Sequence, residues 1–371
     1  MFYDNRIKPL IKWTGGKSQE LPIIKEYLPK SFKNYYEPFI GGGAVWLSVD
    51  ITKHKLYIND FSEDLILFYK SVKEQDELFI FYVSRFVFIW EKIEFLVENH
   101  KIELSELFTE YNSDNITFEE LTEVITKFIN TNKVISNYME EEKYFQTEYI
   151  KQVTNKFKRM KKNSLTKGSL SDIDIIINIE TGFKTGLYVG CRTLYNNKRV
   201  KKDPMYIALY FIMRNYAYSG MFRFNNNGDF NVPYGGNSYN SKNLKTKMEF
   251  YLNDKLQKHL NKTKMYNLDF EEFLSNKVTP SKNDFIFLDP PYDSEFSTYD
   301  GNSFERKEQI RLADLMLNTK AQWMMVIKYT DFIYELYNKK NINIIFFDKK
   351  YQVSIMDRNE QKVQHILIKN Y

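Results

Sequence analysis

The segment DFIFLDPPYDSEF, residues 284–296, places an acid, two prolines and a tyrosine directly after an apolar run. Such a run is typical of a strand buried on both faces of a parallel sheet. Asp289 then falls where the strand leaves the sheet, the edge at which open α/β sheets bind their ligands. Pro290 and Pro291 carry no N–H donor, which predicts a rigid turn whose carbonyls remain acceptors beside the Tyr292 ring.

A second chemical feature is the segment EPFIGGG, residues 37–43, which ends another predicted strand. Its glycines at 41–43 permit positive φ and close approach of the backbone to a cofactor, although they do not form the GxGxxG dinucleotide pattern. Asp60 and Asp269 end two further predicted strands. Each acid alone is more commonly a helix cap, but together with Asp289 they predict a site for an adenosine-containing ligand, with Asp60 on the ribose hydroxyls.

The elements that must position these residues alternate between strand and helix in residues 1–72 and again in residues 264–371. We expect a helix directly after the glycine turn as well. This alternation predicts an α/β fold with a mostly parallel, doubly wound sheet and helices on both faces. The two stretches then form one discontinuous domain around a long insertion.

The insertion divides into two parts by composition. Residues 73–180 read as helical, with a capping box at Thr117 and Glu120 that opens an amphipathic helix. Residues 181–263 contain a helix followed by an Asn- and Gly-rich stretch with hairpin turn signals. Such stretches are usually structural. Because Asn side chains can pair with base edges, this one also suits a finger that reads nucleic acid.

Charge and composition restrict the classes of protein. The net charge of +5 over 371 residues is too small to indicate nucleic-acid binding by itself. Basic residues cluster without acids at 151–168 and again at 196–202. Each cluster is equally well explained as a solvated lysine-rich surface.

Cysteine, histidine and hydropathy exclude several alternatives. Cys191 is the only cysteine, so no intrachain disulfide forms, and a reducing cytoplasm is expected. The histidines lack metal-ligand spacing, so we expect no metal site. The longest apolar run is interrupted by Ser84 and Arg85, and the N-terminal segment lacks an apolar signal core. We expect neither export nor membrane insertion.

Several motifs together resemble the Dam-like (D12 class, alpha-group) DNA adenine-N6 methyltransferases. In that family's order they are IKWTGGK at 11–17, EPFIGGG, IND, FRFNNNGDFNVPYG at 222–235 and LDPPY. The closing segment from residue 354 resembles the family's last strand pair. The resemblance covers residues 6–72 and 185–371, and no counterpart of residues 73–180 is identified. Asn227 stands where GATC-reading members carry arginine, so the resemblance predicts no recognition sequence.

The resemblance implies a Rossmann-like S-adenosylmethionine-dependent methyltransferase sheet and a DNA-recognition hairpin within residues 181–263. The implied cofactor-binding residues are Trp13, Lys17, Phe39, Gly41, Gly43, Asp60, Asp269 and Asp289, with DNA as the alternative partner of Lys17. The implied catalytic residues are Asp289, Pro290, Pro291 and Tyr292. The implied DNA-binding residues are Lys12, Arg223, Asn225, Asn231 and Tyr234.

The activity that the resemblance implies is methylation of the 6-amino group of an adenine flipped out of double-stranded DNA, without a metal, leaving S-adenosylhomocysteine. Residues 73–180 would contact DNA outside the recognition site or a partner protein, in the cytoplasm of a bacterial or phage-infected cell. Methylation of cytosine, RNA adenine or a protein glutamine, and a non-catalytic DNA-binding scaffold, are the alternatives. Asp289 together with the finger favours DNA adenine.

Overall fold

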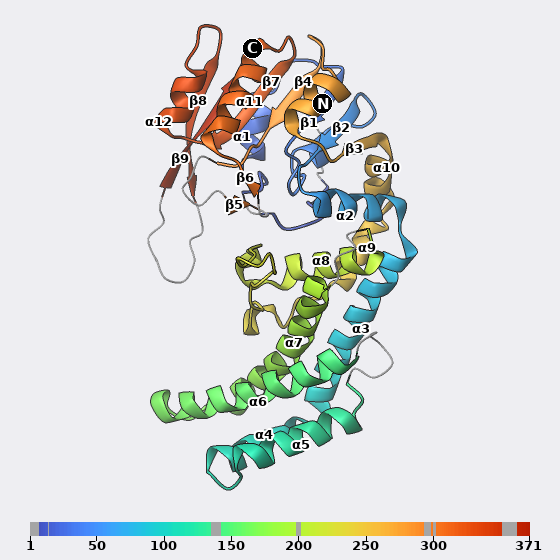
Figure 1. The fold of residues 1–371 in the computed structure, drawn as a ribbon, viewed down its shortest axis with the longest axis vertical. Coiled ribbons are helices and arrows are strands. Elements are labelled where there is room, and N and C mark those ends of the chain that lie inside the picture. The colour runs from blue at the N-terminus through green and yellow to red at the C-terminus, as the bar shows by residue number, and fades with distance from the viewer. Residues whose placement is uncertain are drawn as a thin grey trace. The chain divides into compact units, whose positions relative to one another are not determined.

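The chain forms two compact units, which are described separately. One unit comprises residues 1–74, 222–224 and 251–371, and the other comprises residues 75–221 and 225–250 (Figure 1). The computed structural model describes residues 7–13, 15–134, 142–197, 202–292, 298–299, 302–350 and 362–371. Parts of the basic cluster at 196–202 and of the closing segment from 354 lie outside these residues.

The first unit is an α/β structure. Its strands are β1 (Asn34–Glu37), β2 (Lys55–Asn59), β3 (Thr263–Tyr266), β4 (Phe285–Leu288), β5 (Thr298–Tyr299), β6 (Asn302–Ser303), β7 (Gln322–Lys328), β8 (Asn343–Lys350) and β9 (Lys362–Lys369). Its helices are α1 (Leu21–Glu26), α2 (Glu63–Glu74), α10 (Asp254–Lys262), α11 (Arg306–Asn318) and α12 (Asp331–Tyr337). Helix α9 (Lys245–Tyr251) ends at the junction between the units.

A seven-stranded sheet in the order β3-β2-β1-β4-β7-β9-β8 organises this unit. The pairs among β3, β2, β1, β4 and β7 are parallel, whereas β9 runs antiparallel to both β7 and β8. From β1 the chain first builds outward to β2 and β3, and then returns to place β4 on the other side of β1. This reversal is a topological switch point, where such sheets bind ligands. The predicted fold class is therefore confirmed.

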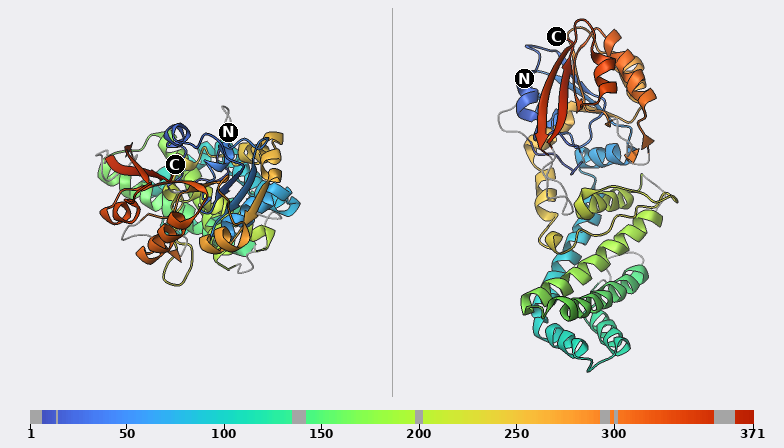
Figure 2. Two further views of the ribbon diagram at one scale, coloured as in Figure 1. Left: turned by 90° about the horizontal axis from the view of Figure 1, so that it is seen from above. Right: turned by 90° about the vertical axis from the view of Figure 1, so that its left-hand side faces the viewer.

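Both faces of the sheet are buried, as the apolar run of β4 predicts. Ile286 and Leu288 pack in a core with residues of α11 and α12, while Phe285 on the opposite face packs against the rings of Phe32 and Tyr35. Figure 2 shows helices on both sides of this sheet. Alternating side chains therefore fix the sheet between two apolar layers.

The segment after the glycine turn differs from the expectation. Instead of a full helix, the structure has a short 3₁₀ helix, Trp46–Ser48. Trp46 is fully buried and donates to Thr263 Oγ1 at 2.9 Å. Burial of the Trp46 side chain fixes residues 46–48 against the sheet. This tertiary contact outweighs the local preference for a longer helix.

The second unit is helical. Its helices are α3 (Glu77–Asn99), α4 (Lys101–Asn112), α5 (Phe118–Thr131), α6 (Glu142–Lys167), α7 (Asp172–Asn197) and α8 (Pro204–Tyr216). The predicted capping box of α5 is confirmed, because Thr117 and Glu120 exchange side-chain-to-backbone hydrogen bonds. The sequence division at residue 180 instead falls inside α7, and residues 225–250 group with 75–221. Among the described residues, no helix is long and apolar enough to cross a membrane.

Close packing of α6 on α7 explains the glycine spacing in the α7 sequence. Gly182, Gly186 and Gly190 lie four residues apart and so share one face of the helix. A Cβ at Gly186 would lie 2.9 Å from the Tyr149 Cα, and one at Gly190 would lie 2.3 Å from the Phe145 ring. These glycines are therefore required for the close approach of the two helices.

Candidate active site

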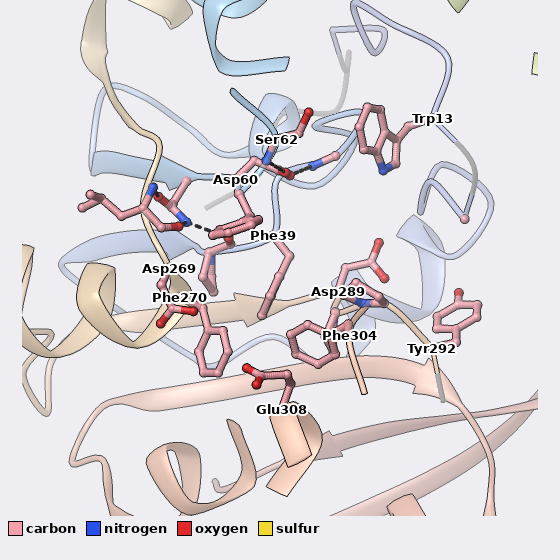
Figure 3. A pocket seen from close by; sticks show the side chains of 18 of the residues that line it. Trp13, Phe39, Asp60, Ser62, Asp269, Phe270, Asp289, Tyr292, Phe304 and Glu308 are labelled. Atoms are coloured by element: carbon pink, nitrogen blue, oxygen red, sulfur yellow. Dashed lines mark hydrogen bonds between the residues drawn. The ribbon is translucent and has the colours of Figure 1, made fainter. Parts of the chain in front are cut away.

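A cavity of about 560 Å³ opens at the carboxyl ends of β1, β2 and β4, beside the switch point. Its wall includes most of the residues for which the sequence predicts a role in cofactor binding or catalysis. These lining residues are Trp13, Phe39, Gly41, Asp60, Asp269, Asp289, Pro290, Pro291 and Tyr292. Figure 3 shows side chains of the lining gathered around one space.

Asp60, which follows β2, is tied to the glycine turn by both of its carboxylate oxygens. Oδ2 accepts from the Gly41 N–H at 3.0 Å, and Oδ1 accepts from the Ser62 N–H at 3.0 Å. Two charge-assisted hydrogen bonds fix the carboxylate and hold the turn against the strand end. A carboxylate oxygen can accept more than one hydrogen bond, so a carboxylate at this position suits ligand hydroxyls.

Asn59, for which the sequence predicts no role, joins three strand ends beneath the cavity. Its side chain is buried and donates to the Pro38 carbonyl at 3.1 Å and to the Leu268 carbonyl at 2.9 Å. Its Oδ1 accepts from the Leu268 N–H at 2.9 Å. The segments after β1 and β3 are thereby held to the end of β2, which keeps Phe39, Asp60 and Asp269 around one space.

The predicted glycines serve different purposes. Gly41 has φ +45° and lines the cavity, and a Cβ there would lie 2.7 Å from the Trp13 ring. Gly43 has φ +72° and does not belong to the cavity lining, since a Cβ there would meet the buried Trp46 ring at 2.8 Å. Gly43 therefore supports the turn through packing, whereas Gly41 lets Trp13 close one side of the cavity.

An aromatic cluster forms another wall. Phe39 lies 5.6 Å from Phe270 and 5.7 Å from Phe304 between ring centroids, and Phe270 lies 5.9 Å from Phe304. Of these, only Phe39 was predicted from the sequence. Flat apolar walls of this kind suit a planar heteroaromatic ring.

Asp269 carries an unpredicted partner, Arg311 of α11. The Arg311 guanidinium donates to Asp269 Oδ2 at 2.5 Å, and also pairs with Glu308 at 2.7 Å. The same guanidinium lies 4.4 Å from the centre of the Phe270 ring. Arg311 and Glu308 both line the cavity. The sequence could not predict the pairing of Arg311 with Asp269, because this contact depends on how α11 packs beside the end of β3.

The turn after Asp289 is held by α11 through Pro291. The sequence predicts free carbonyl acceptors around Pro290 and Pro291, but the Pro291 carbonyl accepts from the Gln309 side chain at 2.8 Å. Gln309 is fully buried, so this contact fixes the turn from below. Among the described residues no hydrogen bond to the Pro290 carbonyl is found, which leaves that oxygen available to a ligand.

Lys17, for which the resemblance implies a contact with the cofactor or with DNA, is buried beside the cavity. Its side chain is 2% exposed and does not line the cavity. The ammonium instead forms an ion pair with Asp289 Oδ1 and donates to Tyr292 Oη at 3.1 Å. The structure thus joins Lys17 to the DPPY segment rather than to the cofactor wall.

Glu37, the last residue of β1, is a buried acid close to this pair. Its Oε2 accepts from the Tyr35 hydroxyl at 2.5 Å. Burial raises the pKa of Glu37 well above its ordinary value, and the nearby Asp289 charge raises it further. Burial thus disfavours the charged form of Glu37 beside Asp289.

The predicted DNA-binding residues fall into two groups. Lys12, Arg223 and Asn225 are exposed and Asn231 is partly exposed, whereas Tyr234 is only 7% exposed. The Tyr234 hydroxyl donates to Asn240 Oδ1 at 3.0 Å inside the helical unit. Tyr234 is thus a core residue, and its expected contact with DNA is not compatible with this burial.

Asn225 is used by its own loop. Its Oδ1 accepts from the Asn227 N–H at 3.0 Å and from the Asp229 N–H at 2.9 Å. The Gly228 φ of +79° lets the loop close on itself. Because the carboxamide oxygen already holds this turn, Asn225 shapes the loop, while Asn226 and Asn227 are exposed at its tip.

Sheet order, switch point and strand-tip acids together define a Rossmann-like α/β enzyme of the methyltransferase type. The family described as D12 class N6 adenine-specific DNA methyltransferase matches residues 13–182 and 174–355. The chain belongs to this family, and it is an enzyme that methylates the N6 atom of adenine in DNA.

Relatives match along nearly the whole chain. The type II methyltransferase M.CviBI of Paramecium bursaria Chlorella virus NC1A is 24% identical over 98% of this chain and 100% of its own length. The type II methyltransferase M.MjaIII of Methanocaldococcus jannaschii is 28% identical over 98% of this chain and 99% of its own length. A DNA adenine methylase of Vibrio cholerae is 23% identical over 85% of this chain and 78% of its own length.

The family match also bears on the helical segment. Residues 73–180, for which no counterpart was identified, lie inside the first matched region of the family. The matched region thus extends across the helical segment. Membership of this family also identifies adenine in DNA as the methylated base, in place of cytosine, RNA adenine or a protein glutamine.

Proposed function

We propose that the protein binds S-adenosylmethionine in the strand-tip cavity and methylates the 6-amino group of an adenine flipped out of double-stranded DNA at a specific site. The observation that carries this proposal is that Asp289, from the end of β4, lines the same cavity as Asp60 and Asp269. An acceptor for the target amine thus lies beside acids suited to an adenosine-containing cofactor. The other product is S-adenosylhomocysteine, and the reaction as proposed requires no metal.

The residues present fit this cofactor. A cavity of about 560 Å³ is within the range of small-molecule sites. Asp60 would accept from the ribose hydroxyls, Asp269 would accept from the adenine amino group, and the Phe39, Phe270 and Phe304 rings would cover the base. When bound, S-adenosylmethionine supplies a methyl group activated by a positively charged sulfur.

The chain's own groups prepare the target amine. The lone pair of this amine is delocalised into the adenine ring, so the amine is a poor nucleophile until its geometry changes. The Asp289 carboxylate and the Pro290 carbonyl accept its two hydrogens and direct the lone pair toward the methyl group. Tyr292 stacks on the flipped base and keeps it in the site. As the N–C bond formed, the methyl–sulfur bond would break and the amine would release one proton to water, so no strong base is required beforehand.

Recognition of DNA is proposed for exposed groups on both units. Lys12, Arg223 and Asn231 would contact the recognition site, together with the loop shaped by Asn225. Asn226 and Asn227 at the loop tip carry amides that can pair with base edges. Basic residues of α6 would contact phosphates outside the site, with a partner protein as the other occupant proposed for the helical segment.

The test is a single-turnover assay with Asp289→Ala and labelled S-adenosylmethionine on duplex DNA. Because Asp289 is assigned to the transition state, methyl transfer should fall by about a thousandfold or more. Affinities for S-adenosylhomocysteine and for the duplex should remain close to those of the unmodified protein. Nucleoside mass spectrometry should find N6-methyladenine as the product.

Asp314→Ala provides the matched control, because Asp314 is an exposed acid on α11 outside the cavity lining. This variant should transfer methyl groups at the normal rate. Near-normal transfer by Asp289→Ala would refute the mechanism. Loss of S-adenosylhomocysteine binding in Asp289→Ala would assign Asp289 to the cofactor instead of the amine.

A further inference from the structure

Lys17 is held by three acceptors at the back of the DPPY segment. Its ammonium donates to the Gly15 carbonyl at 3.0 Å, to Tyr292 Oη at 3.1 Å and to Asp289 Oδ1. An ammonium carries three hydrogens, so this arrangement satisfies each of them. With 2% of the residue exposed, Lys17 has no room to act as a mobile surface lysine.

The surrounding backbone is shaped for this contact. Gly15 has φ +79°, in the region that favours glycine, and its carbonyl faces the Lys17 ammonium. On the other side, the ammonium lies 5.2 Å from the centre of the Tyr292 ring, which in turn packs edge-on against His365 of β9 at 5.7 Å between ring centroids. One lysine therefore joins the N-terminal loop to both ends of the DPPY segment.

We propose that Lys17 is the positioning residue of Asp289 and Tyr292 in methyl transfer, and that it acts through them without contacting cofactor or target. This inference rests on the proposed function of Asp289. Lys17 holds the carboxylate through Oδ1 and thereby fixes the orientation in which the carboxylate meets the target amine. By holding the Tyr292 hydroxyl as well, Lys17 fixes the relative positions of the amine acceptor and the stacking ring.

The positive charge of Lys17 has a second effect. A neighbouring ammonium favours the ionised form of a carboxyl group. Asp289 is thereby kept as an ionised acceptor down to lower pH than without Lys17. Among the described residues, the buried Glu37 of β1 and His365 of β9 are further titratable groups near Asp289 and Tyr292, and burial raises the pKa of Glu37.

Lys17→Met is the main test, since methionine keeps the length of the apolar stem and removes the charged donor. Turnover should fall by about 10- to 100-fold, the expected loss for a hydrogen bond to a charged group. S-adenosylhomocysteine affinity by calorimetry should change by less than about threefold, because Lys17 lies outside the cavity lining. The acid limb of the turnover profile should move to higher pH by about one unit.

Two variants separate charge from packing. Lys17→Arg keeps the positive charge, so the acid limb of its turnover profile should match that of the unmodified protein. Its turnover should lie between those of the unmodified protein and Lys17→Met. Lys30→Met removes an exposed lysine after α1 and should leave both readouts unchanged. If Lys17→Met unfolds below the assay temperature, Lys17→Gln takes its place, because glutamine removes the charge but keeps a hydrogen-bond donor. The acid limb of its turnover profile should also move to higher pH.

Each other outcome overturns the inference. Unchanged turnover with an unchanged acid limb shows that Asp289 needs no help from Lys17. Loss of S-adenosylhomocysteine affinity without a shift of the acid limb makes Lys17 a cofactor ligand, and an equal loss of affinity for all duplexes makes it a DNA contact. An inactive Asp289→Ala beside a fully active Lys17→Met refutes this inference alone, whereas an active Asp289→Ala refutes the proposed function.

Discussion

Each of the three strand-tip acids around the cavity has a different set of partners. Asp60 is held by the backbone N–H groups of Gly41 and Ser62, Asp269 by both the Glu271 N–H and the Arg311 guanidinium, and Asp289 by the Lys17 ammonium. Backbone donors orient a carboxylate without adding a net charge, whereas a guanidinium or ammonium also compensates it. The cavity can therefore bring three acids together without strong mutual repulsion.

Arg311 provides the residue-scale prediction for the cofactor site. Arg311→Met should weaken S-adenosylhomocysteine binding by about tenfold, a discounted value for a charge-assisted contact that is partly exposed to solvent. Removal of the guanidinium leaves Asp269 with the Glu271 N–H as a donor at 2.9 Å, and it uncovers the Phe270 ring face. Glu271→Gln is the control, because Glu271 lies 3.6 Å from the Arg311 guanidinium and is not part of the cavity lining. Unchanged or tighter binding by Arg311→Met, measured by calorimetry, would contradict this role.

The residues that the sequence could and could not predict differ in how they reach the cavity. Asp60, Asp269 and Asp289 were predictable because the ends of adjacent parallel strands meet at one edge. Arg311 and Gln309 reach the site from the helix that follows, so their contacts depend on tertiary packing. Tyr234 was wrongly assigned to DNA because its polar hydroxyl is satisfied by Asn240 inside the core.

Among the elements, the short segment between β1 and β2 depends on burial rather than on helix propensity. Trp46 packs against the His259 ring of α10 at 5.2 Å between ring centroids, and its indole N–H donates to Thr263 at the start of β3. The pattern EPFIGGGAVW predicted a helix here. It could not indicate that the tryptophan would be buried against α10, which comes about two hundred residues later.

His259 gives a prediction about pH and stability at this scale. Burial lowers the pKa of His259 from 6.5 to about 4. Below pH 6.5 the unfolded chain binds a proton on this ring while the folded chain does not, so stability falls as the pH drops from about 6.5 to about 4 and this contribution then levels off. The loss should approach about 3 kcal/mol.

The measurement is denaturant unfolding at several pH values, compared with His259→Phe, which keeps a ring but cannot titrate. The variant should show a shallower fall in the free energy of unfolding over that pH range. Equal pH dependence in the two proteins would mean that His259 is protonated in the folded state or that other groups dominate.

At the scale of the whole molecule, the chemistry lies in a discontinuous α/β unit, whereas most of the remaining chain forms a helical unit. The sequence predicted the first unit well, since strand and helix periodicities alternate there. It divided the second unit at residue 180, because a change in composition occurs inside α7 without interrupting the helix. Relatives that match nearly the full chain make the helical unit a shared feature whose role can be tested.

Helix α6 is the part of this unit best suited to DNA. Its exposed basic residues are Lys151, Lys158, Arg159 and Lys162. Lys161, from the same cluster, is instead tied to Asp114 at 2.5 Å and to the Tyr111 carbonyl at 2.6 Å. Lys161 therefore stabilises the packing of α6 beside the end of α4. Lys151 pairs with Glu148 at 3.4 Å, so Lys158, Arg159 and Lys162 are the residues that we propose for phosphates.

Reversing two of these exposed charges tests whether α6 binds the DNA backbone. Arg159→Glu with Lys162→Glu should weaken binding to cognate and unrelated duplexes by the same factor, because phosphate contacts carry no sequence information. The slope of log affinity against log salt should become shallower by about 0.9 for each phosphate that the variant no longer neutralises. The control, Lys101→Glu with Lys127→Glu on α4 and α5, makes the same change in net charge at other exposed positions. If both double variants flatten the slope equally, the effect is one of overall charge. If only the cognate duplex is affected, α6 reads bases and the backbone assignment is wrong.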